Sequence, residues 1–190
     1  GGSGGIGSAI CIRLAQDGAK VVVHYGGSKD KANKVVNQIT DNSGKAISVQ
    51  EDISNYESVV NLFESTEKQF GKPDIIVNCA GTGDVGKLAE MDEANFDKVF
   101  GLNSKGSFFC MKEAATRLND NGRIINISSC LVPRPQPGFS LYIASKAAIE
   151  SMTKVLAIEL GDRNITVNTV SPGPTETEMY ANSGDDIKSA

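Results

Sequence analysis

Tyr142 and Lys146, four residues apart, are the pair in this sequence best suited to acid–base chemistry. Residues at positions i and i+4 of a helix share one face, so the phenol and the ammonium can point into one site. An unperturbed phenol, with a pKa of about 10, exchanges protons poorly at neutral pH. A fixed ammonium nearby favours the phenolate, so we expect Lys146 to lower the pKa of Tyr142 toward the working range.

Ser129 adds a hydroxyl to this pair. It lies thirteen residues before Tyr142, at the end of a stretch, residues 123–128, that is expected to form a strand. Ligands of open α/β sheets bind beyond the carboxyl ends of the strands, where this hydroxyl would lie. Side chains alternate along a strand, so Ser128 is expected to point away from the face that Ser129 occupies.

The chain opens on a glycine-rich turn, GGSGGIG, which leads directly into helical apolar spacing. Its glycines fit two registers: GxxxGxG uses Gly1, Gly5 and Gly7, and GxGxxG uses Gly2, Gly4 and Gly7. Either register places backbone N–H groups and a helix N-terminus against a pyrophosphate. No Gly-Lys-Ser/Thr follows, so the lysine and hydroxyl of a phosphate-cleaving loop are missing. A plain glycine-rich turn and a flexible tag are the alternatives.

The residues after the next expected strand bear on the choice of dinucleotide. Sites for NAD usually have an Asp or Glu about 20 residues after the glycine turn, where it binds the adenosine ribose. Here that position is Tyr25, and Gly26, Gly27, Ser28 and Lys29 follow. Without a carboxylate to repel it, a 2′-phosphate could be accepted by Ser28 and Lys29. We expect NADP in preference to NAD; the alternative is that Ser28 only caps the next helix.

Helix and strand patterns alternate along the whole chain. Short apolar stretches predict strands over residues 20–25, 45–49, 73–78, 123–128 and 165–170. Helical spacing predicts helices over residues 6–18, 30–41, 54–70, 92–118 and 141–160. Ser54 is expected to cap the third of these helices.

This alternation, without a linker, predicts one α/β domain over residues 1–190. We expect a doubly wound, Rossmann-like parallel sheet with helices on both faces, in three layers. A glycine turn of this kind follows the first strand of its sheet, so we expect that strand to precede Gly1. We also expect the segment that covers the substrate to continue beyond Ala190, so that residues 1–190 form an incomplete domain.

The composition excludes several classes of function. The net charge is −4 without a basic stripe, so neither nucleic acid nor a membrane surface is an expected partner. No apolar run approaches the roughly 20 residues that span a bilayer. Four cysteines without ligand-like spacing and a single histidine predict no metal site. Reduced thiols favour a cytoplasmic protein, or an organellar one if a targeting segment was lost with the N-terminus.

Further motifs follow one another in a fixed order: Asp52-Ile53, Asn78-Cys79-Ala80-Gly81, Asn103 within FGLNSKG, Ser129, Tyr142-x-x-x-Lys146 and Pro172-Gly173. Together with the glycine turn, they resemble the short-chain dehydrogenase/reductase family over essentially the whole chain. The nearest branches are 3-oxoacyl-carrier-protein reductases and the glucose-dehydrogenase-like or aldehyde-reductase-like enzymes. Cys79 departs from the family's usual Asn, which could remove a hydrogen bond that braces the backbone.

The resemblance selects the GxxxGxG register and implies catalytic roles. Tyr142 would exchange the proton of the substrate oxygen, Ser129 would hydrogen-bond the carbonyl, and Lys146 would hold the nicotinamide ribose. Asn103 would hold a water in a proton relay, unless it only satisfies backbone groups at a helix kink. Asp52 would meet the adenine amino group, unless it is only a helix cap.

The cofactor-binding residues that we expect, on these grounds together, are Gly1, Ser3, Gly5, Ile6, Gly7, Tyr25, Ser28, Asp52, Ile53, Asn78, Ala80, Gly81, Tyr142, Lys146, Pro172, Gly173, Thr175 and Thr177.

The expected function is hydride transfer between NADP(H) and a ketone or aldehyde such as a 3-oxoacyl thioester, with NAD the less favoured cofactor. A sugar or polyol dehydrogenase working in the oxidative direction is one alternative. A non-catalytic module that senses NADP is another, against which the intact Ser129, Tyr142 and Lys146 argue. The resemblance also implies a homodimer or homotetramer, paired through the helices over 92–118 and 141–160.

Overall fold

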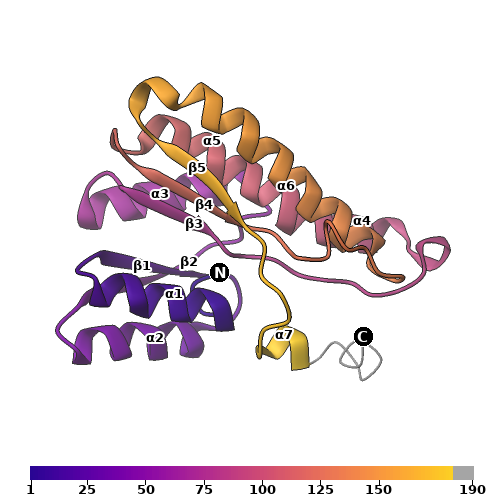
Figure 1. The fold of residues 1–190 in the computed structure, drawn as a ribbon. Coiled ribbons are helices and arrows are strands. Elements are labelled where there is room, and N and C mark those ends of the chain that lie inside the picture. The colour runs from indigo at the N-terminus through magenta and orange to yellow at the C-terminus, as the bar shows by residue number, and fades with distance from the viewer. Residues whose placement is uncertain (182–190) are drawn as a thin grey trace.

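The computed structural model describes residues 1–181, in which helices and strands alternate as predicted (Figure 1). The first half contains α1 (Gly5–Gln16), β1 (Lys20–Tyr25), α2 (Lys29–Asp41), β2 (Lys45–Gln50), α3 (Tyr56–Phe70) and β3 (Ile75–Asn78). The second half contains α4 (Glu93–Phe100), a π-helix (Gly101–Gly106), α5 (Ser107–Arg117), β4 (Arg123–Ile127), α6 (Ser140–Glu159), β5 (Thr166–Val170) and α7 (Glu178–Ala181). Short 3₁₀ turns cover Leu88–Glu90 and Gly161–Arg163.

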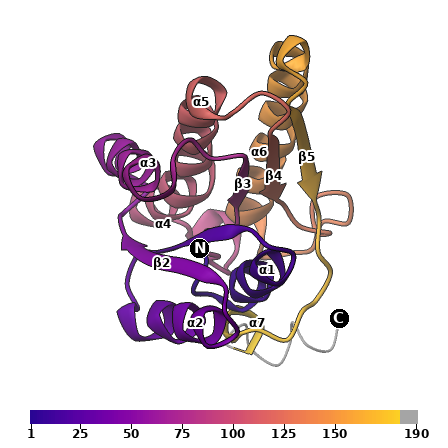
Figure 2. The ribbon, with the colours of Figure 1, turned by 90° about the vertical axis from the view of Figure 1, so that its left-hand side faces the viewer.

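All strand pairs in the described residues are parallel, which confirms the predicted α/β class. The single expected sheet is divided, however: β1 pairs with β2, and β4 lies between β3 and β5. Helices α1 and α2 lie on one side of the strands, and α3, α5 and α6 lie on the other (Figures 1 and 2). The arrangement therefore has the three layers expected of this class.

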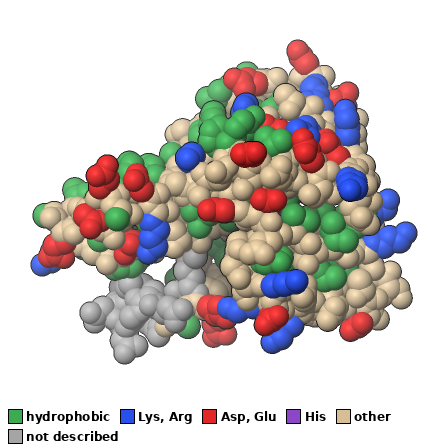
Figure 3. Space-filling model, turned by 180° about the vertical axis from the view of Figure 1, so that it is seen from behind, with side chains coloured by type: hydrophobic (Ala, Val, Ile, Leu, Met, Phe, Trp, Pro, Cys, Tyr) green, Lys and Arg blue, Asp and Glu red, His purple; other side chains and the backbone are tan. Residues whose placement is uncertain are grey.

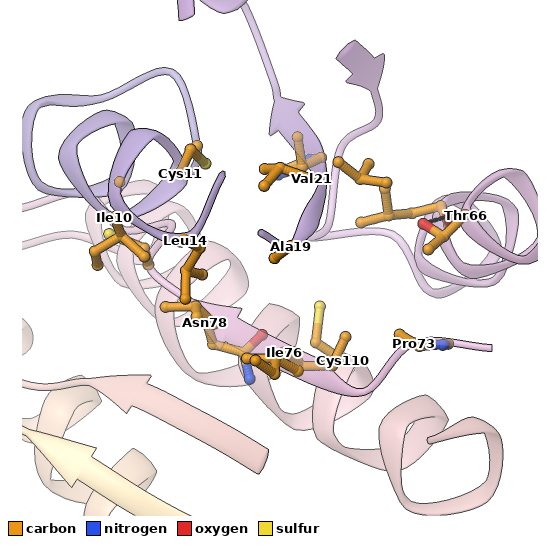
Figure 4. A pocket seen from close by; sticks show the side chains of 18 of the residues that line it. Ile10, Cys11, Leu14, Ala19, Val21, Thr66, Pro73, Ile76, Asn78 and Cys110 are labelled. Atoms are coloured by element: carbon orange, nitrogen blue, oxygen red, sulfur yellow. Dashed lines mark hydrogen bonds between the residues drawn. The ribbon is translucent and has the colours of Figure 1, made fainter. Parts of the chain in front are cut away.

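A cavity of about 440 Å³ separates the two sheets (Figure 4). Its walls are mostly apolar, with Ile10 and Leu14 from α1, Val21 from β1 and Ile76 from β3 among the lining residues. The expected strand ahead of Gly1 would lie here, between β1 and β3, and it stays a prediction.

Two groups of buried side chains hold the layers together. One lies between α1, β1 and α2, where Val21, Val23 and Tyr25 alternate along the strand toward Ala32 and Val35 of the helix. The other joins α3 and α5 to β4 and includes Val59, Phe63, Met111, Leu118 and Ile124. Burying one such side chain contributes about 1.5–3 kcal/mol to the stability of the fold. These contacts therefore hold the strands, and with them the strand ends at which the site lies.

The expected helix over residues 92–118 is interrupted by the π-helix, whose wider turn carries Asn103. A Cβ at Gly106 would lie 3.0 Å from the Ile53 carbonyl oxygen, so only a glycine lets the helix pass so close to the chain after β2. Single π turns are frequent at functional sites. Hydrophobic periodicity does not separate them from an α-helix, because both bury the same side of the segment.

The expected capping role of Ser54 is wrong. The N-cap of α3 is Asn55, whose side-chain oxygen accepts from the backbone N–H groups of Glu57 and Ser58 at 2.8 and 3.3 Å. The Ser54 hydroxyl instead donates to Asp52 Oδ1 at 2.7 Å. The preference of asparagine for the N-cap is at least as strong as that of serine, so the choice between neighbours depends on the turn that precedes them.

Candidate active site

The carboxyl ends of β3, β4 and β5 meet at one edge of their sheet because all three strands are parallel. Backbone bonds beyond the strands keep the chains together there: Ser128 N donates to the Val170 carbonyl at 2.8 Å, and Cys130 N to the Pro172 carbonyl at 3.0 Å. Ser129 follows β4 at this edge and is 7% exposed. Ser128 uses its hydroxyl elsewhere on α6, where it donates to Glu150 Oε1 at 2.7 Å; its expected orientation opposite to Ser129 stays a prediction.

Helix α6 brings Tyr142 and Lys146 to Ser129. The Lys146 Nζ lies 5.8 Å from the centre of the Tyr142 ring, and the Ser129 hydroxyl is near enough to the Tyr142 hydroxyl to lower its pKa. Phe139 packs edge-on against the Tyr142 ring with a centroid distance of 6.5 Å. The three residues that were expected to act together therefore do lie together.

The electrostatics of this pair differ from the expectation. Burial raises the pKa of Tyr142, and the hydrogen bond from Ser129 lowers it by less. Burial also lowers the pKa of Lys146 to about 8. The Lys146 Nζ donates to the Ile127 carbonyl at 2.9 Å and lies over the Tyr142 ring. The Tyr142 pKa is therefore raised, against the prediction that it is lowered, because desolvation of the phenolate outweighs the effect of Ser129.

Asn103 is fully buried beside Lys146 and binds the loop after β3. Its Oδ1 accepts from Thr82 N at 2.8 Å, and its Nδ2 donates to the Thr82 carbonyl at 2.8 Å and to Ser145 Oγ at 2.9 Å. The alternative noted above, that Asn103 satisfies backbone groups, therefore describes its side chain, and its role toward a relay water stays a prediction. Neither Thr82 nor Ser145 was singled out from the sequence.

The packing of the glycine turn fits the GxxxGxG register. A Cβ at Gly1 would lie 2.4 Å from Ala80 N, one at Gly5 2.5 Å from Thr177 Cγ2, and one at Gly7 2.1 Å from the Gly1 carbonyl oxygen. A Cβ at Gly4 would meet its nearest neighbour at an ordinary 3.6 Å. The three glycines of this register thus stand where a side chain does not fit.

Helix α1 begins in this turn with the features of an anion site. Its N-cap is Gly4, no side chain caps its first N–H groups, and its first turn carries no acidic residue. Ser3 and Ile6, both half-buried, flank the cap. Free N–H groups and the helix dipole together favour a phosphate, so the turn fits the pyrophosphate of a dinucleotide.

The end of β1 fits a cofactor phosphate in part. Ser28 is the N-cap of α2, but its hydroxyl makes no capping bond, and Lys29 beside it is exposed. Tyr25 corrects the expectation: its side chain is 4% exposed and packs in the core between α1 and α2. Its ring therefore cannot reach a ribose, and its alternation with Val21 and Val23 was the signal for burial.

Asp52 lies exposed after β2 and accepts from the backbone N–H and hydroxyl of Ser54 at 3.0 and 2.7 Å. These hydrogen bonds lower the pKa of its carboxyl, which therefore carries a charge at neutral pH. Asn55, not Asp52, caps α3. Ile53 is 5% exposed in the core, so only its backbone can face a ligand.

The chain after β3 forms the floor of the site. The Asn78 side chain is turned along the sheet, where Nδ2 donates to Asn126 Oδ1 at 2.7 Å, so its expected contact with a cofactor is limited to its backbone. Ala80 packs its backbone against Gly1, and a Cβ at Gly81 would lie 3.2 Å from both Asn103 Oδ1 and Lys146 Nζ. The backbone of Gly81 therefore packs closely against the Lys146 ammonium and the Asn103 amide.

The segment after β5 returns to the glycine turn. Pro172 accepts the bond from Cys130, and the Thr175 hydroxyl donates to the Gly173 carbonyl at 3.0 Å. Thr177 packs against Gly5, and Glu178 pairs with Lys31 of α2. The expected substrate segment beyond Ala190 lies outside the described residues.

Charged and thiol groups in residues 1–181 form no cluster of three that could hold a metal ion, and the four cysteines are free. Nor is any helix of this part of the chain long and apolar enough to cross a membrane.

Comparison with known proteins agrees with this geometry. A family model described as "short chain dehydrogenase" matches residues 1–188. A short-chain dehydrogenase/reductase of Pestalotiopsis microspora is 45% identical over 181 residues, which cover 94% of this chain and 68% of that protein. A probable tetrahydroxynaphthalene reductase of Zymoseptoria tritici is 41% identical over the same length, with the same coverage. A short-chain dehydrogenase of Burkholderia cenocepacia, solved in complex with NADP, superposes with a TM-score of 0.95 at 40% identity and covers 100% of this chain and 78% of its own.

Proposed function

The chain belongs to the short-chain dehydrogenase family of oxidoreductases, and we propose that within it the protein is an NADP-dependent carbonyl reductase. The observation that carries the proposal is the meeting of Ser129, Tyr142 and Lys146 at the carboxyl end of β4, beside Gly81 of the loop after β3. Reduction of a carbonyl requires a group that donates a proton and a group that hydrogen-bonds the carbonyl oxygen, close to a dinucleotide site. Tyr142 and Ser129 can supply these two groups, with the Lys146 ammonium beside them.

When bound, the nicotinamide supplies the hydride that the carbonyl carbon accepts. The glycine turn and the N-terminus of α1 bind the pyrophosphate through backbone N–H groups. Ser129 Oγ hydrogen-bonds the substrate oxygen and fixes its position beside Tyr142. The Tyr142 hydroxyl donates its proton to that oxygen, so hydride and proton together convert the carbonyl to an alcohol. Lys146, whose ammonium lies beside the Tyr142 ring, would hold the ribose hydroxyls of the nicotinamide.

Ser28 and Lys29 support the choice of NADP. The Ser28 hydroxyl makes no capping bond at the N-terminus of α2, and the Lys29 side chain forms no ion pair with another of residues 1–181; a 2′-phosphate would also meet the helix dipole there. The Burkholderia cenocepacia relative was solved with NADP. The reductive direction is supported by the relative described as a probable tetrahydroxynaphthalene reductase.

The test is NADPH oxidation by the purified protein with a panel of ketones, aldehydes, 3-oxoacyl thioesters and, in reverse with NADP, sugars and polyols. We expect faster turnover in the reductive direction at neutral pH. Faster oxidation of a sugar or polyol would replace the proposal by a dehydrogenase. Tight NADPH binding without turnover of any compound would favour a sensing module.

We also propose that the protein assembles as a homodimer or homotetramer and works in the cytoplasm. Exposed apolar side chains on α5 and α6, such as Phe108, Val155 and Ile158, support the assembly. The free thiols are compatible with a reducing compartment.

A further inference from the structure

Ser145 is a fully buried hydroxyl, 0% exposed, that lies between the two reactive side chains of α6 and has no step in the proposed mechanism. Its Oγ donates to the carbonyl oxygen of Tyr142 at 2.7 Å and accepts from Asn103 Nδ2 at 2.9 Å. The hydroxyl therefore donates one hydrogen bond within α6 and accepts one from the π-helix. Such a bridge has a defined length, so it fixes the distance between the two elements.

Asn103 extends the bridge to the loop that forms the floor of the site. The remaining groups of its amide bind Thr82 on both sides, to the backbone N–H and to the carbonyl, each at 2.8 Å. Gly81, the residue before, is the one whose absent side chain leaves room beside Lys146 Nζ. A continuous chain of hydrogen bonds therefore runs from the Tyr142 backbone to the loop over the Lys146 ammonium.

Ser104, the next residue of the π-helix, also binds Ser145, through its backbone carbonyl. Its Oγ donates to the Ser145 carbonyl at 3.1 Å. Two adjacent residues of the π-helix thus bind one residue of α6, through its hydroxyl and through its backbone. A regular α-helix presents adjacent residues about 100° apart, so the wider π turn has a role in bringing both to Ser145.

We propose that Ser145 is a positioning residue for the reaction: it fixes the first turn of α6 against the Gly81–Thr82 loop and so sets the positions of Tyr142 and Lys146 relative to that loop. The inference rests on the proposed function, in which these two side chains act together. Loss of the hydroxyl removes one of the bonds to the Tyr142 carbonyl and frees one Asn103 N–H, and the bonds of Ser104 and Thr82 remain. A misplacement of about 1 Å is enough to cost as much as 100-fold in rate.

Thr153 provides a matched control on the same helix. It is 5% exposed, its hydroxyl donates to the Ile149 carbonyl at 2.8 Å, and it accepts from the buried Asn126 Nδ2 at 2.8 Å. The arrangement is similar to that of Ser145 two turns further along, but the two bonds of the Thr153 hydroxyl go to Asn126 and Ile149, and not to the π-helix or the Gly81–Thr82 loop. Loss of either hydroxyl removes one bond to a helix carbonyl and one from an asparagine amide. The two variants therefore differ mainly in where on α6 the bonds are lost.

The experiment compares Ser145→Ala, Ser145→Cys and Thr153→Val by unfolding, steady-state kinetics and hydrogen exchange at the Thr82 amide. We expect Ser145→Ala to lower kcat about ten-fold with the KM for NADPH changed less than about three-fold, and to speed exchange at Thr82. Ser145→Cys, with its weaker donor, should recover part of kcat. Thr153→Val should lower the unfolding midpoint by a similar amount, but leave kcat within about two-fold and Thr82 exchange unchanged.

Equal losses of kcat in Ser145→Ala and Thr153→Val would overturn the inference, because loss of stability alone would then explain the loss of activity. Wild-type kcat and wild-type Thr82 exchange in Ser145→Ala would overturn it too. If the wild-type protein reduces no carbonyl compound, the proposed function fails. The exchange rate at Thr82 still reports then whether Ser145 holds the loop, so the two failures are distinguishable.

Discussion

Burial acts on Tyr142 and Lys146 in opposite directions, because it disfavours the charged form of each group. It raises the pKa of the phenol and lowers that of the ammonium to about 8. At neutral pH the phenol is therefore protonated and the lysine is still charged. A protonated phenol is the state that the proposed reduction requires, because Tyr142 has to donate its proton to the carbonyl oxygen.

The pH dependence of reduction follows from these shifts. Lys146 carries its charge below about pH 8 and loses it above, whereas Tyr142 keeps its proton to a higher pH. We expect kcat/KM for the carbonyl substrate to fall as the pH rises through about 8. Lys146→Arg should be slower but should lose this limb, because a guanidinium stays charged. If kcat/KM falls at the same pH in Lys146→Arg as in the wild-type protein, the fall belongs to another titrating group.

Lys29 is expected to set the cofactor preference. Lys29→Glu places a carboxylate where the proposed 2′-phosphate binds, and a charge-assisted bond is typically about 1.5–3 kcal/mol, or roughly 10- to 100-fold. The kcat/KM for NADPH should fall by that factor while that for NADH is kept or rises. Lys34→Glu, also exposed on α2, is the control and should change neither. If both substitutions lower kcat/KM for NADPH equally, the effect comes from the net charge of the protein and not from a contact of Lys29 with the 2′-phosphate.

A test of preference at Tyr25 is less useful than the sequence suggests. An Asp at this position would replace a ring that is 4% exposed in the core, so it would lower stability as well as alter binding. Sequence position alone places Tyr25 at the cofactor, and only the packed structure turns its ring inward.

At the scale of elements, periodicity and turn residues were enough to predict where helices and strands alternate, but not their exact ends. The strand over β1 was predicted at its observed bounds, because Val21, Val23 and Tyr25 alternate inward. The π-helix, the division of the sheet and the cap of α3 were not predicted. Each depends on contacts between segments far apart in the sequence, such as that of Gly106 with Ile53.

The site shows the same limit. Ser129, Tyr142 and Lys146 could be predicted because their spacing is tied to one strand end and one helix face. Ser145 could not, since a serine inside a helix has no local pattern that distinguishes a bridge from a solvent-facing hydroxyl. The sign of the Tyr142 pKa shift also required the burial of the ring, which spacing does not report.

The cap of α3 gives a test at this scale. Asn55→Ala removes the acceptor for two N–H groups and should lower the free energy of unfolding by about 0.5–2 kcal/mol. Ser54→Ala removes only a bond to the exposed Asp52 and should cost less than about 0.5 kcal/mol. Urea unfolding of both variants measures the difference. A larger loss in Ser54→Ala would return the capping role to the residue that the sequence first suggested.

At the scale of the molecule, charge and apolar surface are distributed differently. Seen from behind, Lys and Arg side chains are interspersed with Asp and Glu, whereas hydrophobic side chains gather in the upper part, where α5 and α6 lie (Figure 3). Phe108 is 49% exposed, Val155 57% and Ile158 83%. A surface with mixed charges and apolar side chains gathered over helices favours contact with a second protein surface, and not with a polyanion.

Ile158→Glu tests whether that surface joins copies of this chain. A carboxylate at the most exposed apolar position of α6 would be buried in the interface, so the assembly should dissociate to a smaller species at micromolar concentration. Sedimentation velocity measures the change. Leu88→Glu, at an apolar residue that is 70% exposed outside these helices, should leave the assembly intact. An unchanged sedimentation coefficient for Ile158→Glu would exclude α6 from the interface.

The central claim is that Tyr142 gives its proton to an oxygen whose carbon accepts hydride from a bound nicotinamide. Its most direct measurement follows deuterium from the C4 position of labelled NADPH to the product alcohol, in the wild-type protein and in Tyr142→Phe. We predict one deuterium on the carbinol carbon in the wild type, and transfer at least about 1,000-fold slower in Tyr142→Phe with NADPH affinity unchanged. Transfer at the wild-type rate in Tyr142→Phe would contradict the account.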